Sequence, residues 1–144
     1  MRTRKFKRYD MQIDREIEKA VLNFSEHLMS NSKWVRLIDA LIEDNDNVKK
    51  VKFKKIHTTQ IGDLFLEEDT IYEFDYWKNG FEGLNSLGGW LTYKEIEYLI
   101  FPRIIDDKDN LKQDLKAIVK TIESVGQFLL EIDEDEVKLI CYKK

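Results

Sequence analysis

The stretch Phe128-Leu-Leu-Glu-Ile-Asp-Glu-Asp-Glu-Val-Lys-Leu-Ile-Cys141 decides the fold of this chain. Two apolar runs, 128–132 and 137–141, enclose four consecutive acidic residues, which are Asp133, Glu134, Asp135 and Glu136. Only antiparallel strands can be joined by so short a connection. We therefore expect a β-hairpin whose acidic tip is exposed to water. Cys141 is expected to be a buried thiol because it falls within the second apolar run.

Helical periodicity dominates the residues before this hairpin. Apolar side chains recur at three- and four-residue steps over 111–125, which predicts a helix that Gly126 ends. Upstream, Thr92-Tyr93-Lys94-Glu95 matches the capping-box pattern, so a further helix is expected to start at Tyr93. Pro102 should stop that helix, because proline cannot continue a helical hydrogen-bond ladder.

The N-terminal half changes from a helical period to a strand period. Helices are expected over about 10–29 and 33–43, and strands over 50–57, 63–67 and 70–77. The tripeptide Ser30-Asn31-Ser32 separates the two helices and offers a cap for the second. Val51 and Phe53 alternate with a basic run made of Lys49, Lys50, Lys52, Lys54 and Lys55. This alternation predicts a half-buried strand whose lysines face water, as they do on guarded sheet edges.

The expected elements are segregated along the chain rather than alternating. Two helices precede three strands, and after a loop at 78–89 two more helices precede the hairpin. This order favours an α+β fold in which an antiparallel sheet of about five strands packs against about four helices. The 144 residues suffice for one core. We expect a single domain over 10–144, preceded by a basic flexible N-terminus at 1–9.

Aromatic residues concentrate in the middle of the chain. Eight of the seventeen lie between Tyr72 and Tyr98, together with four of the six glycines. The sequence leaves open whether this aromatic cluster is core, pocket or interface. The glycine spacing in the 78–89 loop matches neither a dinucleotide-binding pattern nor a phosphate-binding loop.

Charge and composition exclude several classes of function. The net charge is −4, but five of the first eight residues are positive, which leaves −9 for the rest. An acidic body disfavours nucleic acid as a partner. Since no apolar run is long enough to span a bilayer, we expect no membrane partner and a cytoplasmic location. His27 and His57 lack metal-ligand spacing, so we expect neither metal nor cofactor, and no catalytic signature marks an enzyme.

Acidic clusters beside aromatic residues favour protein recognition, because carboxylates steer a basic partner and aromatic side chains anchor it. The partner-binding residues expected on this basis are Glu67, Glu68, Asp69, Glu73, Asp75, Trp77, Asp133, Glu134, Asp135 and Glu136. The alternative is a small ligand-binding domain or enzyme with an aromatic pocket under the 78–89 loop.

Three segments carry a resemblance to known proteins, namely Ser32-Lys33-Trp34, Tyr76-Trp77-Lys78-Asn79-Gly80 and Tyr93-Lys94-Glu95-Ile96-Glu97-Tyr98. With its small size and acidity, the chain resembles bacterial immunity proteins and other small bacterial proteins encoded beside toxins. The resemblance implies a protein that neutralises a toxin acting in the cytoplasm by occluding the toxin's basic active site. The basic protein partner would then be a toxin domain.

Overall fold

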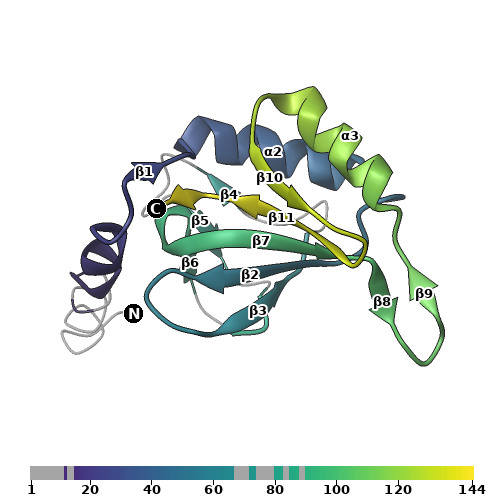
Figure 1. Ribbon diagram of the computed structural model, residues 1–144, viewed down its shortest axis with the longest axis horizontal. Coiled ribbons are helices and arrows are strands. Elements are labelled where there is room, and N and C mark those ends of the chain that lie inside the picture. The colour runs from purple at the N-terminus through teal and green to yellow at the C-terminus, as the bar shows by residue number, and fades with distance from the viewer. Residues whose placement is uncertain (1–11, 13–14, 67–71, 74–79, 83–84, 88–89) are drawn as a thin grey trace.

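The computed structural model describes residues 12, 15–66, 72–73, 80–82, 85–87 and 90–144 (Figure 1). Residues 15–21 form a helix. Two longer helices follow, α2 (Asn31–Glu43) and α3 (Leu115–Val125), and one 3₁₀ turn, η1 (Tyr93–Glu95). The strands are β1 (Glu26–His27), β2 (Val51–Lys55), β3 (Ile61–Leu64), β4 (Tyr72–Glu73), β5 (Gly80–Glu82), β6 (Trp90–Thr92), β7 (Ile96–Pro102), β8 (Ile104–Asp106), β9 (Leu111–Lys112), β10 (Leu129–Ile132), β11 (Glu136–Ile140) and β12 (Tyr142–Lys143).

A five-stranded antiparallel sheet in the order β10-β11-β7-β2-β3 forms the centre of the molecule. Helices α2 and α3 lie side by side on one face of this sheet (Figure 1). The core lies between these two layers, where Phe53, Leu99 and Leu139 form a cross-strand row beneath the helices. The expected α+β class is confirmed, with three helices and one 3₁₀ turn among the described residues instead of about four helices.

Helix α2 matches its sequence pattern closely. The Ser30 hydroxyl accepts the Lys33 N–H at 3.1 Å, as expected of an N-cap. Its buried side chains are Trp34, Leu37, Ile38 and Leu41, which are the apolar stripe that the sequence predicts. The end of α2 is tied to α3, because the Thr121 hydroxyl donates to the Asp44 carboxylate at 2.5 Å.

Helix α3 starts later than expected. Asp114 is its N-cap and accepts the N–H groups of Lys116 and Ala117. Leu111 instead belongs to β9, which pairs with β8 in a hairpin that the sequence did not predict. Asn110, immediately before β9, has a positive φ of 53°, which is not the backbone conformation of a right-handed helix. Gly126 follows the last helical residue, as expected.

The helix expected over residues 93–101 is wrong, because β7 occupies most of this segment. The capping-box contacts exist, and the Thr92 N–H and hydroxyl both donate to the Glu95 carboxylate, at 3.0 and 2.7 Å. They close a single 3₁₀ turn. Lys54 pairs with Tyr98 while Lys55 pairs with Ile96, so Glu97 is an extra residue in a β-bulge. The bulge lets Ile96 and Leu99 both reach the core, and this three-residue spacing imitates a helix.

The first helix ends earlier than expected. The helix ends at Val21, and the following residues pair with the C-terminal strand, where His27 lies opposite Tyr142. The Leu28 N–H also donates to the Cys141 carbonyl at 2.8 Å. Long-range strand pairing therefore overrides the helical period after Val21.

The middle of the chain also departs from the expectations. The segment 78–89 is not a continuous loop, because β5 within it pairs with β4 and β6 in a three-stranded sheet. Of the strand expected over 70–77, the structure describes only β4. The strand expected at 63–67 is β3, and it ends at Leu64.

The lysine-rich strand β2 lies inside the sheet, between β7 and β3, and not at an edge. Its lysines on the face away from the helices are partly neutralised, since Lys54 lies 2.6 Å from the Glu97 carboxylate. On the same face, the Lys138 ammonium lies 4.9 Å from the centre of the Tyr98 ring.

Of the aromatic cluster, Tyr93 belongs to the core, where it stacks on Trp34 with ring centres 5.4 Å apart.

Candidate functional site

The tip of the β10–β11 hairpin is held in one shape by its own first residue. The Asp133 carboxylate accepts the N–H groups of Asp135 and Glu136 at 2.7 and 2.9 Å. The Asp133 N–H donates to the Glu136 carbonyl at 3.1 Å and closes the turn. Aspartate favours this position because its short side chain can bond to the backbone two residues ahead. Asp133 therefore orders the tip on which the other carboxylates are displayed.

A backbone contact fixes the tip to the rest of the molecule. The Arg103 N–H donates to the Asp135 carbonyl at 2.8 Å, and the Arg103 guanidinium lies 3.8 Å from the Asp135 carboxylate. The Asp135 side chain is 84% exposed, so water screens most of this ion pair. Glu136 lies at a similar 3.8 Å from Lys138. Glu134 is exposed and has no ion pair among the described residues. The tip thus keeps an uncompensated negative charge.

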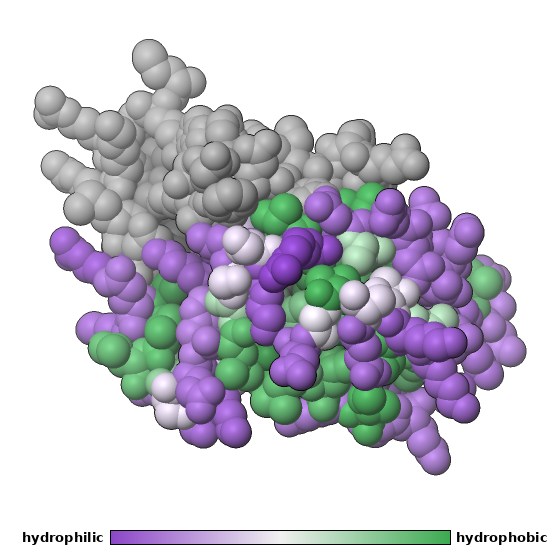
Figure 2. Space-filling model, turned by 90° about the horizontal axis from the view of Figure 1, so that it is seen from above, coloured by the Kyte–Doolittle hydropathy of each residue, from purple (hydrophilic) through white to green (hydrophobic). Residues whose placement is uncertain are grey.

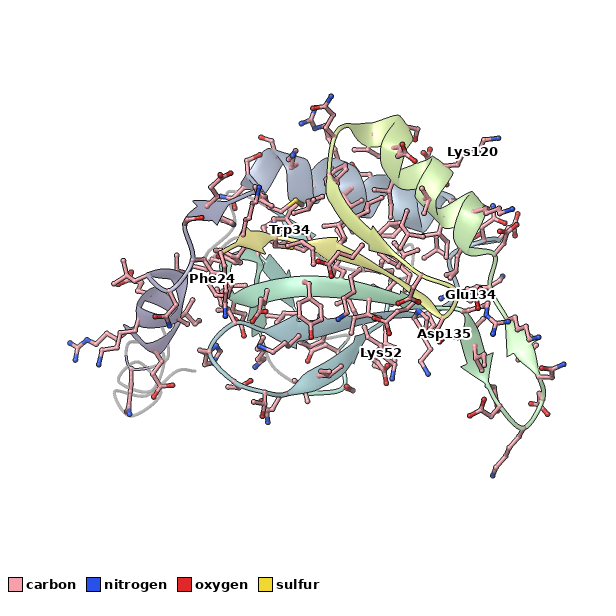
Figure 3. All side chains as sticks on the ribbon, in the orientation of Figure 1. Phe24, Trp34, Lys52, Lys120, Glu134 and Asp135 are labelled. Carbon is pink, nitrogen blue, oxygen red and sulfur yellow. The ribbon has the colours of Figure 1, made fainter. Side chains whose placement is uncertain are left out.

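A groove of about 840 Å³ separates this tip from the first turns of α3. Its lining combines apolar side chains, Leu115, Val119 and Ile132, with charged ones, Arg103, Lys116, Lys120, Glu123 and Glu134. Ile132 is 60% exposed. Seen from above, hydrophobic residues reach the surface among hydrophilic ones (Figure 2). Glu134 and Asp135 lie at the end of the hairpin, and Lys120 points outward from α3 (Figure 3).

Gln113 fixes the base of the groove. It is buried, and its side-chain oxygen accepts the N–H groups of Lys49 and Lys50 at 2.9 and 3.0 Å. Its side-chain nitrogen donates to the carbonyls of Lys50 and Pro102 at 2.9 and 2.6 Å. The Gln113 backbone N–H donates to the Arg103 carbonyl, so one residue links the start of α3 to β2 and to the tip. The only sequence signal for this role is a glutamine immediately before the α3 cap.

The structure places only part of the partner-binding set expected from the sequence. It brings together Asp133, Glu134, Asp135 and Glu136 at the tip. Glu73 lies on β4, in a different sheet. Five of the expected residues lie outside the described part of the chain, namely Glu67, Glu68, Asp69, Asp75 and Trp77. The aromatic pocket was expected to be lined by Tyr72, Phe74, Tyr76, Trp77 and Trp90, and the side chains of all five lie outside the described part. That alternative therefore stays a prediction.

Groups that often carry chemistry are shielded or isolated. Cys141 is fully buried, which raises the pKa of its thiol far above its ordinary value and keeps it protonated. Burial also lowers the pKa of His27, whose ring stacks on Tyr142 with centres 4.4 Å apart. Burial lowers the pKa of His57 as well, partly offset by the Glu95 carboxylate. Among the residues that the structure describes, no three His, Cys, Asp or Glu side chains could hold a metal ion together.

None of the described helices combines the length and apolarity needed to cross a membrane. In comparisons with known proteins, the chain matches no family model, and searches of curated proteins and of solved structures return no significant match.

Proposed function

We propose that this chain is a protein-binding module, specifically an immunity protein that neutralises a cytoplasmic-acting toxin by occluding its basic active site. The observation that carries the proposal is the acidic tip of the β10–β11 hairpin. The Glu134 and Asp135 side chains are exposed and only weakly paired within the chain, and the turn that carries them is held by Asp133 and Arg103.

The tip and the groove offer two different contributions to binding. Exposed carboxylates attract a basic surface over a distance of several ångströms and so increase the rate of association. Apolar side chains at the groove, here the exposed Ile132 and the half-buried Val119, exclude water after contact and slow dissociation. An acidic tip beside a groove that contains apolar side chains therefore suits a partner whose basic site has an apolar border.

The test is affinity capture from cells of the source organism, followed by binding kinetics with the captured protein. A Glu134→Lys, Asp135→Lys variant should associate at least about tenfold more slowly than the parent at low salt. The difference should shrink as salt is added, because ions screen exposed charges. Asp133 is left intact because it builds the turn.

The matched control is an Asp107→Lys, Asp109→Lys variant, which makes the same charge change on the exposed β8–β9 turn. The control should associate almost as fast as the parent. If both variants associate equally slowly, the slower association would result from the change in net charge alone. That result would contradict a binding site at the tip. Capture of partners without any basic surface would contradict the proposed function.

A further inference from the structure

The two edges of the central sheet differ in how they are covered. At the β3 edge, the Asp63 N–H donates to the Ser86 hydroxyl at 2.7 Å, and the Ser86 N–H donates to the Asp63 carbonyl at 2.9 Å. Leu64 also forms an isolated bridge with Asn85. At the other edge, no described strand pairs with the outer side of β10. The edge at β10 is therefore the open one.

The register shows which backbone groups of β10 point outward. The hydrogen-bonded contact between Asp133 and Glu136 closes the hairpin. In an antiparallel ladder, bonded and non-bonded pairs alternate. Leu129 and Glu131 should therefore bond to β11, and the N–H and C=O groups of Leu130 and Ile132 should point away from the sheet. No described group bonds to these outward backbone groups.

β10 has no lysine, no proline and no bulge, and its one charged side chain is Glu131. Edge strands commonly carry lysine or proline, or a bulge that turns the edge away. The strand reads Leu129-Leu-Glu-Ile132 and pairs with β11 without any shift of register. Leu129 is 42% exposed and Ile132 60% exposed, on opposite faces of the sheet. Ile132 faces the groove beside α3.

Charge selects the kind of strand that this edge would accept. Glu131 is exposed and has no ion pair among the described residues, since the Lys138 opposite it lies beside Glu136 and the Tyr98 ring. Asp133 and Glu134 extend the same negative edge. In a second copy of the chain paired about Glu131, two carboxylates would lie opposite each other, which is destabilising. A strand with a basic side chain at that position would complement the edge.

We propose that β10 binds an extended segment of the partner protein as an additional strand of the central sheet, running along the groove beside α3. The segment carries a lysine or arginine opposite Glu131 and apolar residues opposite Leu129 and Ile132. Backbone hydrogen bonds to Leu130 and Ile132 hold it in place. The identity of the partner as a toxin rests on the proposed function, whereas the mode of binding rests on β10 alone.

The test uses the full chain and amide hydrogen exchange measured by NMR, with a short synthetic peptide of alternating valine and threonine around one central lysine. In the free protein, the amides of Leu130 and Ile132 should exchange fast and those of Leu129 and Glu131 slowly. Peptide at ten times its Kd should slow the two outward amides about tenfold. The same peptide with N-methyl groups on alternate residues, which block the backbone bonds, should have no such effect.

Two variants of β10 complete the test. Ile132→Pro should abolish the effect of the peptide, because proline removes one of the outward N–H groups. Glu131→Lys should bind a peptide with glutamate in place of lysine more tightly than the lysine peptide. This reversal keeps the proposal testable if Ile132→Pro does not fold.

Several results would overturn the proposal. These are slow exchange of both outward amides in the free protein, equal binding of the N-methylated peptide, no binding of the lysine peptide, or self-association through β10. If a captured partner shows salt-dependent association through the tip but leaves the exchange of Leu130 and Ile132 unchanged, strand addition is wrong and the proposed function stands. If the peptide adds to β10 but no basic protein is captured, strand addition stands without the proposed function.

Discussion

At the scale of single residues, buried polar groups connect the segments around the candidate site. Gln113 satisfies four backbone groups, of Lys49 and Lys50 just before β2 and of Pro102 in β7. Glu95 receives two hydrogen bonds from Thr92 and an ion pair from Lys55. Such groups are costly to leave without partners in a dry interior. The sequence marks these residues only as polar, because their partners lie far away along the chain.

Replacing Gln113 tests this connection. Gln113→Leu keeps most of the side-chain volume but leaves four backbone groups, of Lys49, Lys50 and Pro102, without these partners. We expect the free energy of unfolding to fall by at least about 2 kcal/mol, measured by chemical denaturation. The control Gln127→Leu changes an exposed glutamine and should stay within about 0.5 kcal/mol of the parent. A similar loss in both variants would show that Gln113 has no special role.

Stability should depend on pH through the two histidines. Burial lowers the pKa of His27 and of His57 below the ordinary value of 6.5. As the pH falls through 6.5, the unfolded chain takes up protons that the folded chain resists, so the free energy of unfolding decreases. We expect denaturation midpoints to decline from pH 7 to pH 5.5, and a His27→Gln, His57→Gln variant to lose much of that slope. An unchanged slope in the variant would assign the decline to other groups.

At the scale of elements, the sequence correctly predicted the helices and strands whose bounds do not depend on contacts with distant parts of the chain. The α2 stripe and the β10–β11 hairpin follow directly from their periods and caps. The prediction of a helix was wrong at β7, because the bulge at Glu97 gives the apolar residues of this strand the spacing that is typical of a helix. It failed after Val21, where pairing with β12 ends the helix. The acidic tip was predictable from its charge run, but the groove was not, since it requires α3 to lie beside the hairpin.

Gly62 of β3 lies directly opposite Phe53 of β2 and makes room for its ring. A Cβ at Gly62 would lie 2.8 Å from both the Phe53 Cζ and the Leu87 Cγ atoms. Because Phe53 is fully buried, its ring has little room to move, and Gly62→Ala should cost about 1 to 3 kcal/mol by chemical denaturation.

Gly126 provides the matched control for this substitution. It has an extended φ of 167°, and the nearest atom to an added Cβ lies 3.9 Å away. Gly126→Ala should be neutral, or stabilising by up to about 1 kcal/mol, because alanine restricts the unfolded chain. Equal destabilisation by the two substitutions would contradict this account of the β2–β3 pair.

At the scale of the whole molecule, the C-terminal residues hold the N-terminal part of the described chain in place. β12 pairs with β1, and Tyr142 contacts Phe24 and His27 through its ring. The Tyr142 hydroxyl donates to the Lys94 carbonyl at 2.6 Å. One buried side chain thus joins β1, η1 and the C-terminal strand.

Removing that side chain should loosen this part of the molecule. Tyr142→Ala should lower the free energy of unfolding by about 3 to 5 kcal/mol, as for other buried aromatic residues. Amide exchange should accelerate most in residues 15–28, because these lose their contact with β12. Lys143→Ala, at the exposed neighbour, should have little effect. Uniform acceleration over the whole chain would instead indicate that β1 and β12 unfold only with the core.

The pairing of β1 with β12 also sets an order of events during synthesis. Ser25 and Lys143, which share two hydrogen bonds, are 118 residues apart. At about 5 to 20 residues per second, a ribosome needs roughly 6 to 24 seconds to supply the second after the first. During that interval the segment around β1 lacks the strand with which it pairs, and the Phe24 ring lacks the Tyr142 ring that it contacts. Chaperones that shield nascent chains would therefore find a binding site around residues 24–27.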